Sequence, residues 1–138
     1  MGQNVIMIDD NEDDLFFTRI VFERSGLDLT LHQFTSAREA LSYFERRELE
    51  EPALVLLDIN MPGMDGFDFL EAYEKLSPNK RQSKVVVMLT SSIDDRDRER
   101  ALFFASVKAF LSKPIDAGAA AEMIKLLETG QPHCQETD

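Results

Sequence analysis

Residues 53–67, ALVLLDINMPGMDGF, join an unbroken apolar run to a loop rich in Pro and Gly. A strand that is apolar along its whole length belongs to a parallel sheet covered on both faces, because neither side of it meets water. Ligands bind beyond the carboxyl ends of such strands, which is where Asp58 stands. The stretch therefore predicts a buried strand that presents a carboxylate to a binding crevice.

Three further apolar runs in the chain follow the same plan. VIMIDD at 5–10 ends in Asp9 and Asp10, KVVVMLT at 84–90 ends in Thr90, and VKAFLSK at 107–113 ends in Lys113. If these strands lie in one parallel sheet, their ends meet at one edge. Carboxylates, a hydroxyl and an ammonium group would then converge on a single crevice.

Helical patterns occupy the segments between the strands. The first covers residues 12–25 and stops at Gly26, a favoured residue just past a helix end. Ser36 caps the second helix, and the third opens after the loop at 59–66. The fourth helix opens at Asp94, with acids that complement the positive end of the helix dipole, and the last opens near Asp116.

Three segments carry more detailed expectations. LTLHQF at 29–34 alternates apolar and polar residues and predicts a strand at or near a sheet edge. SPNKRQSK at 77–84 is predicted to be a polar, partly basic loop. In the helix that opens at Asp94, the predicted buried side consists of Ala101, Leu102, Phe104 and Ala105.

Five strands that alternate with five helices predict an α/β fold, an open doubly wound parallel sheet rather than a closed eight-stranded barrel. The 138 residues fit one domain around a single core. We expect residues 1–128 to form that domain and residues 129–138 to form a short mobile tail.

Composition excludes several classes of partner. The formal net charge of −11, without a long Lys/Arg run, argues against nucleic-acid and membrane-surface binding. The single cysteine, Cys134, rules out an intrachain disulfide, and no apolar stretch reaches the roughly 18 residues of a membrane span. The N-terminus shows no signal-peptide pattern, so the expected location is cytoplasmic.

The predicted cluster of Asp9, Asp10 and Asp58 needs a cation, because neighbouring carboxylates repel one another. Mg2+ suits such a site best, with Mn2+ as a substitute, since it prefers hard oxygen ligands and a phosphate. Asp58 could then attack phosphorus and form an acyl phosphate, with Lys113 neutralising charge and Thr90 donating a hydrogen bond. Taken singly, each residue also has an ordinary explanation as a turn, a cap or a solvated side chain.

Together, IDDNEDD, LLDINMPGMDGF, MLTSS and FLSKP resemble the receiver domains of two-component response regulators over roughly residues 5–127. The resemblance implies a flavodoxin-like sheet with strand order 2-1-3-4-5. It is strongest to single-domain regulators of the chemotaxis and phytochrome-associated types. It also implies that Asp58 is the phosphoacceptor, that Asp9, Asp10, Asp58 and the Asn60 main-chain carbonyl bind the metal, and that Lys113 contacts the phosphoryl group.

The resemblance also assigns a switch. Thr90 and Phe110 are the expected switch residues, and Asn60 and Ser92 are the positions expected to tune hydrolysis of the phosphoryl group. An ordinary core aromatic of the fifth strand is an equally good interpretation of Phe110. The Lys113-Pro114 bond is expected to be cis.

Two positions depart from the family pattern. Ser106 and Val107 stand where Gly and Ala are common, so the local backbone is expected to differ there. Phe110 stands where Tyr is frequent, so this side chain has no hydroxyl with which to mark the inward state.

The leading hypothesis is a single-domain response regulator. A sensor histidine kinase or phosphotransfer protein would phosphorylate Asp58, and an unidentified downstream protein would bind in response. The expected output face is the fourth helix, fifth strand and fifth helix, through which a homodimer could also form. Apart from its own phosphorylation and dephosphorylation, the protein is expected not to be an enzyme. The alternatives are a metal-dependent phosphohydrolase acting on a diffusible substrate and a phosphorylation-independent docking module.

Overall fold

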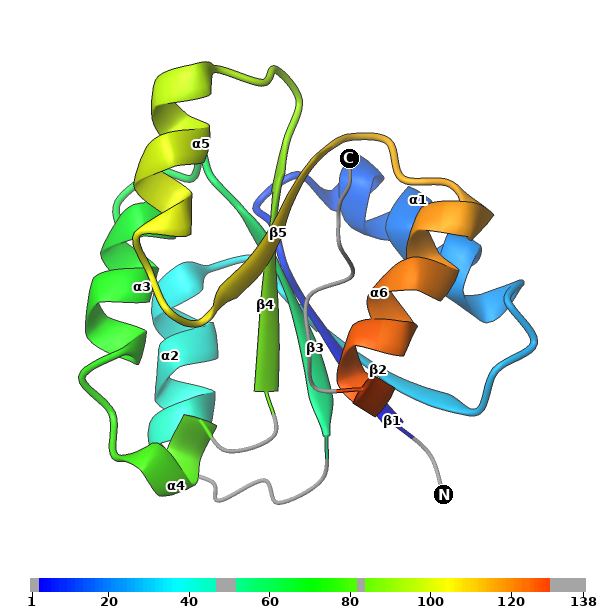
Figure 1. Cartoon of the computed structure of the whole chain (residues 1–138), viewed down its shortest axis with the longest axis horizontal. Helices are drawn as coiled ribbons and strands as arrows, with labels where there is room; N and C mark the ends of the chain where they lie inside the picture. The colour runs from blue at the N-terminus through cyan, green and yellow to red at the C-terminus, as the bar shows by residue number, and fades with distance from the viewer. Residues whose placement is uncertain (1–2, 47–51, 82–83, 130–138) are drawn as a thin grey trace.

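The computed structural model describes residues 3–46, 52–81 and 84–129. Its centre is a five-stranded parallel sheet in the order β2-β1-β3-β4-β5 (Figure 1). The strands are β1 (Gln3–Ile8), β2 (Leu29–Phe34), β3 (Ala53–Asp58), β4 (Lys84–Thr90) and β5 (Val107–Ser112). This confirms the doubly wound architecture and the strand order that the resemblance implied.

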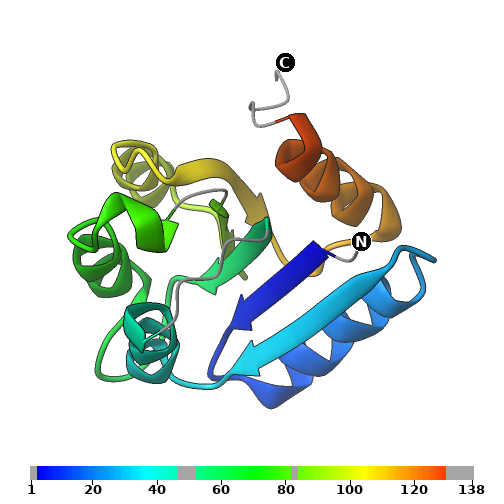
Figure 2. The same cartoon turned by 90° about the horizontal axis from the view of Figure 1, so that it is seen from below.

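Helices cover both faces of the sheet. α2 (Ala37–Arg46), α3 (Gly66–Tyr73) and α5 (Asp95–Leu102) lie on one face, and α1 (Glu12–Glu23) and α6 (Ala117–Thr129) lie on the other (Figures 1 and 2). These are the five helices expected from the sequence. An additional single turn, α4 (Pro78–Arg81), lies within the segment predicted as a loop.

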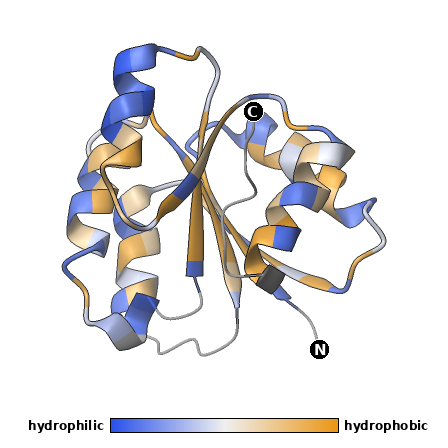
Figure 3. Ribbon diagram, viewed as in Figure 1, coloured by the Kyte–Doolittle hydropathy of each residue, from blue (hydrophilic) through white to orange (hydrophobic). Residues whose placement is uncertain are grey.

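Alternation along the central strands explains why both faces are covered. Ile6 and Val55 belong to the core under α2, α3 and α5, whereas their neighbours Val5 and Leu54 belong to the core under α1 and α6. Successive side chains of a strand point to opposite faces, so an entirely apolar strand fills two cores at once. The hydropathy colouring shows the central strands as apolar along most of their length (Figure 3).

The predicted ends of several elements are confirmed. β2 is an edge strand with a mixed burial pattern, as its alternation indicated. The Asn11 side chain caps α1, and Gly26 beyond its end has a φ of +79°. The Ser36 hydroxyl accepts a hydrogen bond from the Glu39 backbone at the start of α2. The Lys113-Pro114 bond is cis. Of the predicted tail at 129–138, residues 130–138 lie outside the described part of the chain.

One expectation about the core was wrong. Leu102 was predicted to be buried, but α5 ends there and the side chain is 55% exposed. Ala105 is also exposed, whereas Ala101 is buried and Phe104 packs at the edge of the core. Fewer residues of this segment are buried than predicted because α5 ends before Phe104. The Phe104 ring stacks on Phe67 of α3 from the turn that follows the helix.

The backbone of the turn around Ser106 is hydrogen-bonded to a side chain of another element. The Ser106 backbone N–H donates a hydrogen bond to the Glu74 carboxylate at the end of α3, at 2.7 Å. The β4–β5 register shifts between Val86 and Val87. A side chain from another element thus satisfies a backbone group in the turn where the family commonly has Gly.

Candidate functional site

The carboxyl ends of four strands place the predicted residues at one edge of the sheet. Asp58 is the last residue of β3 and Thr90 the last of β4, while Asp9 follows β1 and Lys113 follows β5. β1 and β3 are direct neighbours, which brings Asp9 beside Asp58. The topology therefore gathers residues that are up to 104 positions apart in the chain.

Asp9, Asp10 and Asp58 each offer a carboxylate oxygen within 4.8 Å of the others. Asp9 and Asp58 are buried, and Asp10 is exposed. Two like charges about 4 Å apart repel by roughly 4 kcal/mol at an effective dielectric of about 20, so this arrangement favours a bound cation. The donors are hard oxygens, and one of them, the Asp10 carboxylate, is exposed to solvent. The residues present therefore fit Mg2+.

Lys113 forms ion pairs with both buried carboxylates, Asp9 and Asp58, and with Asp14. Its Nζ lies 2.6 Å from Asp9 Oδ2, 3.0 Å from Asp58 Oδ1 and 2.9 Å from Asp14 Oδ2. The Lys113 backbone N–H also donates a hydrogen bond to the Thr90 carbonyl at 2.8 Å. This bond holds the start of the loop after β5 beside the end of β4. The ammonium is thus held where it can contact an oxygen of a group attached to Asp58.

The pKa shifts follow from burial and charge. Burial raises the pKa of Asp58 from 3.8 to about 6, the charge of Asp9 adds to the rise, and Lys113 opposes it. Burial also raises the pKa of Asp9, against hydrogen bonds from Lys113 and the Asn11 backbone. Burial alone would lower the pKa of Lys113, but hydrogen bonds to Asp9, Asp14 and Asp58 outweigh it and raise that pKa. The cluster therefore keeps Lys113 cationic and disfavours its own negative charge in the absence of a metal.

The loop after Asp58 is held against the site by its glycines and a capping box. Gly63 has a φ of +77°, a conformation that favours glycine. A Cβ on Gly66 would lie 2.6 Å from the Asp58 carbonyl oxygen, so only glycine allows α3 to begin this close to β3. Asp65 and Asp68 cap α3 reciprocally. Asn60, the predicted source of a main-chain metal ligand, is exposed at the start of this loop.

The two predicted switch residues, Thr90 and Phe110, are both buried. Thr90 is buried, and its hydroxyl donates to the Ser92 carbonyl at 3.0 Å and accepts from the Ser92 N–H at 3.2 Å. Phe110 is 5% exposed and packs in the core under α2, α3 and α5. In this structure the hydroxyl is engaged within its own loop and the ring lies inward. Ser92 itself is exposed.

Asp14 is the residue that sequence reasoning missed. It lies in the first turn of α1, where acids have an ordinary role as complements to the helix dipole. IDDNEDD contains it, but only the fold shows that this acid, unlike Asp13, contacts Lys113.

The model of the family described as response regulator receiver domain matches residues 5–125, nearly the whole described chain. The chain belongs to this family. Receivers are the phosphoacceptor modules of two-component systems, they bind Mg2+ at an acidic pocket, and they interact with sensor histidine kinases.

Solved receivers share the fold. A response regulator receiver protein from Dyadobacter fermentans is 28% identical, with a TM-score of 0.83 over 92% of this chain and 98% of that one. The bacteriophytochrome response regulator AtBRR is 29% identical, with a TM-score of 0.76 over 99% of each chain.

A curated relative is longer. The cyclic di-GMP phosphodiesterase response regulator RpfG of Xanthomonas campestris is 32% identical over 115 residues, which is 83% of this receiver but 29% of RpfG. The receiver thus spans less than a third of RpfG, and the match does not extend to the rest of that protein. None of the described helices of the receiver is long and apolar enough to cross a bilayer.

Removing Asp10 tests the acidic cluster. Asp10→Ala is expected to weaken Mg2+ binding by at least about tenfold, because the cluster loses one of its three carboxylate donors. The metal-free variant should be at least as stable as the wild type, since one repelling carboxylate is gone. Isothermal titration with Mg2+ and thermal unfolding in EDTA measure the two effects.

Asp13→Ala is the matched control, because it removes the same charge from an exposed position outside the cluster. A wild-type dissociation constant for Asp10→Ala would show that Asp10 is not a ligand.

Proposed function

We propose that Asp58 of this receiver accepts a phosphoryl group from a phosphohistidine of a sensor histidine kinase or phosphotransfer protein. The observation that carries the proposal is the placement of the Lys113 ammonium 3.0 Å from Asp58 beside the Asp9–Asp10 pair. A nucleophilic carboxylate, an ammonium group and a set of oxygen donors for a metal are the parts that phosphoryl transfer needs.

Each residue has a role in the transfer. An Asp58 oxygen attacks phosphorus, the bond from phosphorus to the donor histidine breaks, and an acyl phosphate forms. Lys113 donates a hydrogen bond to a phosphoryl oxygen as charge develops. Asp9, Asp10, Asp58 and the Asn60 carbonyl would hold Mg2+, and Mn2+ would also fit this donor set. The bound metal supplies charge neutralisation for the phosphoryl oxygens.

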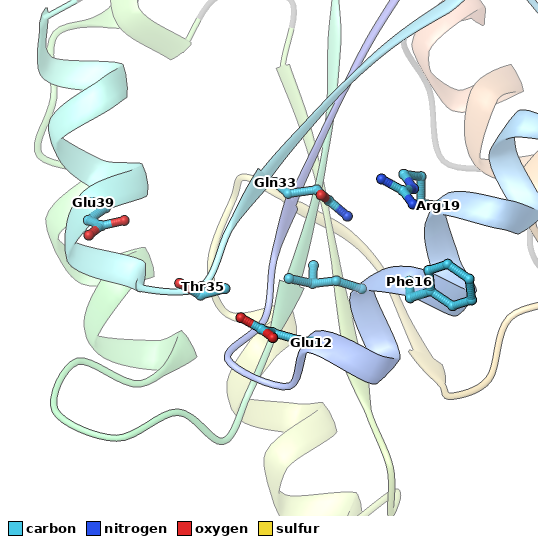
Figure 4. A pocket seen from close by; sticks show the side chains of 7 residues that line it. Glu12, Phe16, Arg19, Gln33, Thr35 and Glu39 are labelled. Atoms are coloured by element: carbon cyan, nitrogen blue, oxygen red, sulfur yellow. The ribbon is translucent and has the colours of Figure 1, made fainter.

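The surroundings of the site favour a protein donor over a small diffusible substrate. The hollow beside Lys113, lined also by Asp14, Phe17 and Pro114, does not include Asp58, and its volume of about 40 Å3 is far below the roughly 300 to 1,000 Å3 of usual ligand pockets. A larger hollow, about 360 Å3, lies between α1 and the end of β2 (Figure 4), but none of its lining residues is a proposed site residue. This supports a phosphoacceptor rather than a phosphohydrolase.

Reaction with small donors separates the two functions. Acetyl phosphate or phosphoramidate with Mg2+ should add one phosphoryl group per chain, as seen by intact-mass analysis. A generic phosphomonoester such as p-nitrophenyl phosphate should not be turned over. Sustained turnover of the monoester without a labelled protein would instead support the phosphohydrolase. A protein that takes no label but still binds a kinase would support the docking module.

The signal is proposed to leave through α5, β5 and α6. A phosphoryl oxygen on Asp58 would draw the Thr90 hydroxyl away from Ser92, and the Phe110 ring would repack beside it. Exposed apolar side chains lie at the end of α5, where Leu102 is 55% and Phe103 is 88% exposed. This surface would bind a downstream protein or a second copy of the receiver.

The Thr90 switch makes a testable prediction. Beryllofluoride with Mg2+ should shift backbone amide NMR signals of residues 102–111 in the wild type. Thr90→Ala should confine the shifts to the loops around Asp9 and Asp58, because the hydroxyl that links the two regions is missing. Since Phe110 lacks a phenolic hydroxyl, its two states are expected to differ by packing alone. Wild-type shifts that never reach residues 102–111 would exclude this output face.

The proposal also covers hydrolysis of the acyl phosphate, the cellular location and the extent of the domain. Asn60 and Ser92 are exposed near the acceptor and are proposed to tune self-catalysed hydrolysis of the acyl phosphate. The protein is proposed to act in the cytoplasm. Residues 1–128 are proposed to form the receiver domain, followed by a short tail.

A further inference from the structure

We infer that Asp14 is a positioning residue that holds the Lys113 ammonium at the site while Asp9 and Asp58 are engaged by metal and phosphoryl group. The inference rests on the proposed function of the same site and adds a residue to its machinery. Asp14 contributes by orienting Lys113 rather than by touching the phosphoryl group.

The geometry shows that the ammonium is fully occupied. An ammonium group has three N–H donors, and Lys113 Nζ lies within 3.0 Å of a carboxylate oxygen on each of Asp9, Asp14 and Asp58. The three acids come from different elements, since Asp9 follows β1, Asp58 ends β3 and Asp14 belongs to α1. Removing any one acid therefore leaves a donor without its charged partner.

Asp14 differs from the other two partners in its place relative to the cation site. The carboxylate cluster that can hold a metal consists of Asp9, Asp10 and Asp58, and Asp14 is not part of it. Asp14 is also the most exposed of the three partners, with 36% of its side chain accessible, against 9% for Asp9 and 8% for Asp58.

This difference determines what happens when the site is loaded. With a cation at the cluster, the carboxylates of Asp9 and Asp58 would face it, and the Lys113 ammonium would be repelled by its charge. Asp14 stays outside that cluster, so its carboxylate can still compensate the charge of Lys113. Without Asp14, the Lys113 ammonium would be held less strongly beside Asp58 during phosphoryl transfer.

An ordinary explanation for Asp14 is that acids stabilise the first turn of a helix. That explanation applies equally to Asp13, which lies in the same turn and is exposed. The contact with Lys113 is what distinguishes the two residues, so Asp13 provides the matched control.

The kinetic test compares Asp14→Asn, Asp13→Asn and Asp14→Glu in the full chain. With phosphoramidate and saturating Mg2+, Asp14→Asn should be phosphorylated about three- to tenfold more slowly than the wild type, as expected for loss of one partly exposed charge-assisted hydrogen bond. Asp13→Asn should react at the wild-type rate, and Asp14→Glu should recover part of the lost rate. Equal slowing by Asp13→Asn, or a wild-type rate for Asp14→Asn, would overturn the inference.

A spectroscopic test does not depend on phosphorylation. The Lys113 ammonium proton signal in metal-free protein should exchange faster with water in Asp14→Asn than in Asp13→Asn. In the beryllofluoride complex, Asp14→Asn should shift the fluorine-19 resonance of the fluorine that contacts Lys113. Unchanged ammonium exchange in Asp14→Asn would overturn the inference alone. A wild-type protein that takes no phosphoryl group would instead overturn the proposed function.

Discussion

Asp58→Asn is expected to abolish Mg2+-dependent phosphorylation by acetyl phosphate or phosphoramidate. An amide oxygen is a poor nucleophile, and Asp58 is the last residue of β3, 3.0 Å from the Lys113 ammonium and followed directly by the loop that opens α3. Intact-mass analysis should show one added phosphoryl group in the wild type and none in the variant. Undiminished labelling of Asp58→Asn would mean that the acceptor lies elsewhere.

The same substitution should stabilise the metal-free protein at neutral pH. Burial and the charge of Asp9 raise the pKa of Asp58 to about 6 from 3.8, so the folded protein holds this proton more tightly than the unfolded chain. Stability is therefore lost as the pH rises through that window, and an Asn side chain avoids the loss.

The variant should have the higher melting temperature at about pH 7.5 in EDTA, with a difference that shrinks as the pH falls toward about 4. Excess Mg2+ should reduce the difference, because it binds the folded wild type. A variant that is less stable than the wild type at neutral pH without metal would contradict this description of the cluster.

The second large effect is expected at Gly66. A Cβ there would meet the Asp58 carbonyl oxygen at 2.6 Å and the Ile59 Cα at 3.0 Å, and neither backbone atom can move without shifting β3. Gly66→Ala is expected to lower the free energy of unfolding by about 3 kcal/mol. Because the strain falls on the backbone of Asp58, the proposed acceptor, the phosphorylation rate should fall as well. Denaturant unfolding and labelling kinetics measure both effects.

Gly118→Ala is the control for Gly66. Gly118 lies in α6, where the nearest atom to a new Cβ would be Asp116 Oδ1 at 3.5 Å, an ordinary contact. Alanine should therefore be neutral or stabilising there, by up to about 1 kcal/mol. A Gly66→Ala protein as stable as the wild type would show that α3 and β3 are not packed as described.

The central strands and the position of Asp58 at the edge of the sheet could be predicted because the relevant information is local in sequence. An unbroken apolar run such as 53–58 indicates burial on both faces, and the residue at its end is then placed at the functional edge of the sheet. That Lys113 and Asp9 lie at the same edge of the sheet followed from the same rule, although 104 positions separate them.

The contacts that escaped prediction depend on side-chain direction. Asp14 meets Lys113 because the first turns of α1 lie beside residues 113–115, which follow β5, and a helical pattern does not indicate which acid of a turn points inward. The two hydrogen bonds between the Thr90 hydroxyl and the Ser92 backbone were not predicted either. The prediction that Leu102 is buried was wrong because α5 ends at this residue. The end of the helix, rather than the spacing of its apolar residues, determines which side chains of that segment are buried.

The most direct test of the central claim is phosphotransfer from the histidine kinases of the source organism. Each kinase is first labelled with radioactive ATP and then mixed briefly with the receiver, with Mg2+ or with EDTA. The account predicts that label moves rapidly from the histidine of at least one kinase to Asp58, only with Mg2+, and never to Asp58→Asn. Label that stays on every kinase, or that reaches the receiver equally in EDTA or in Asp58→Asn, would contradict it.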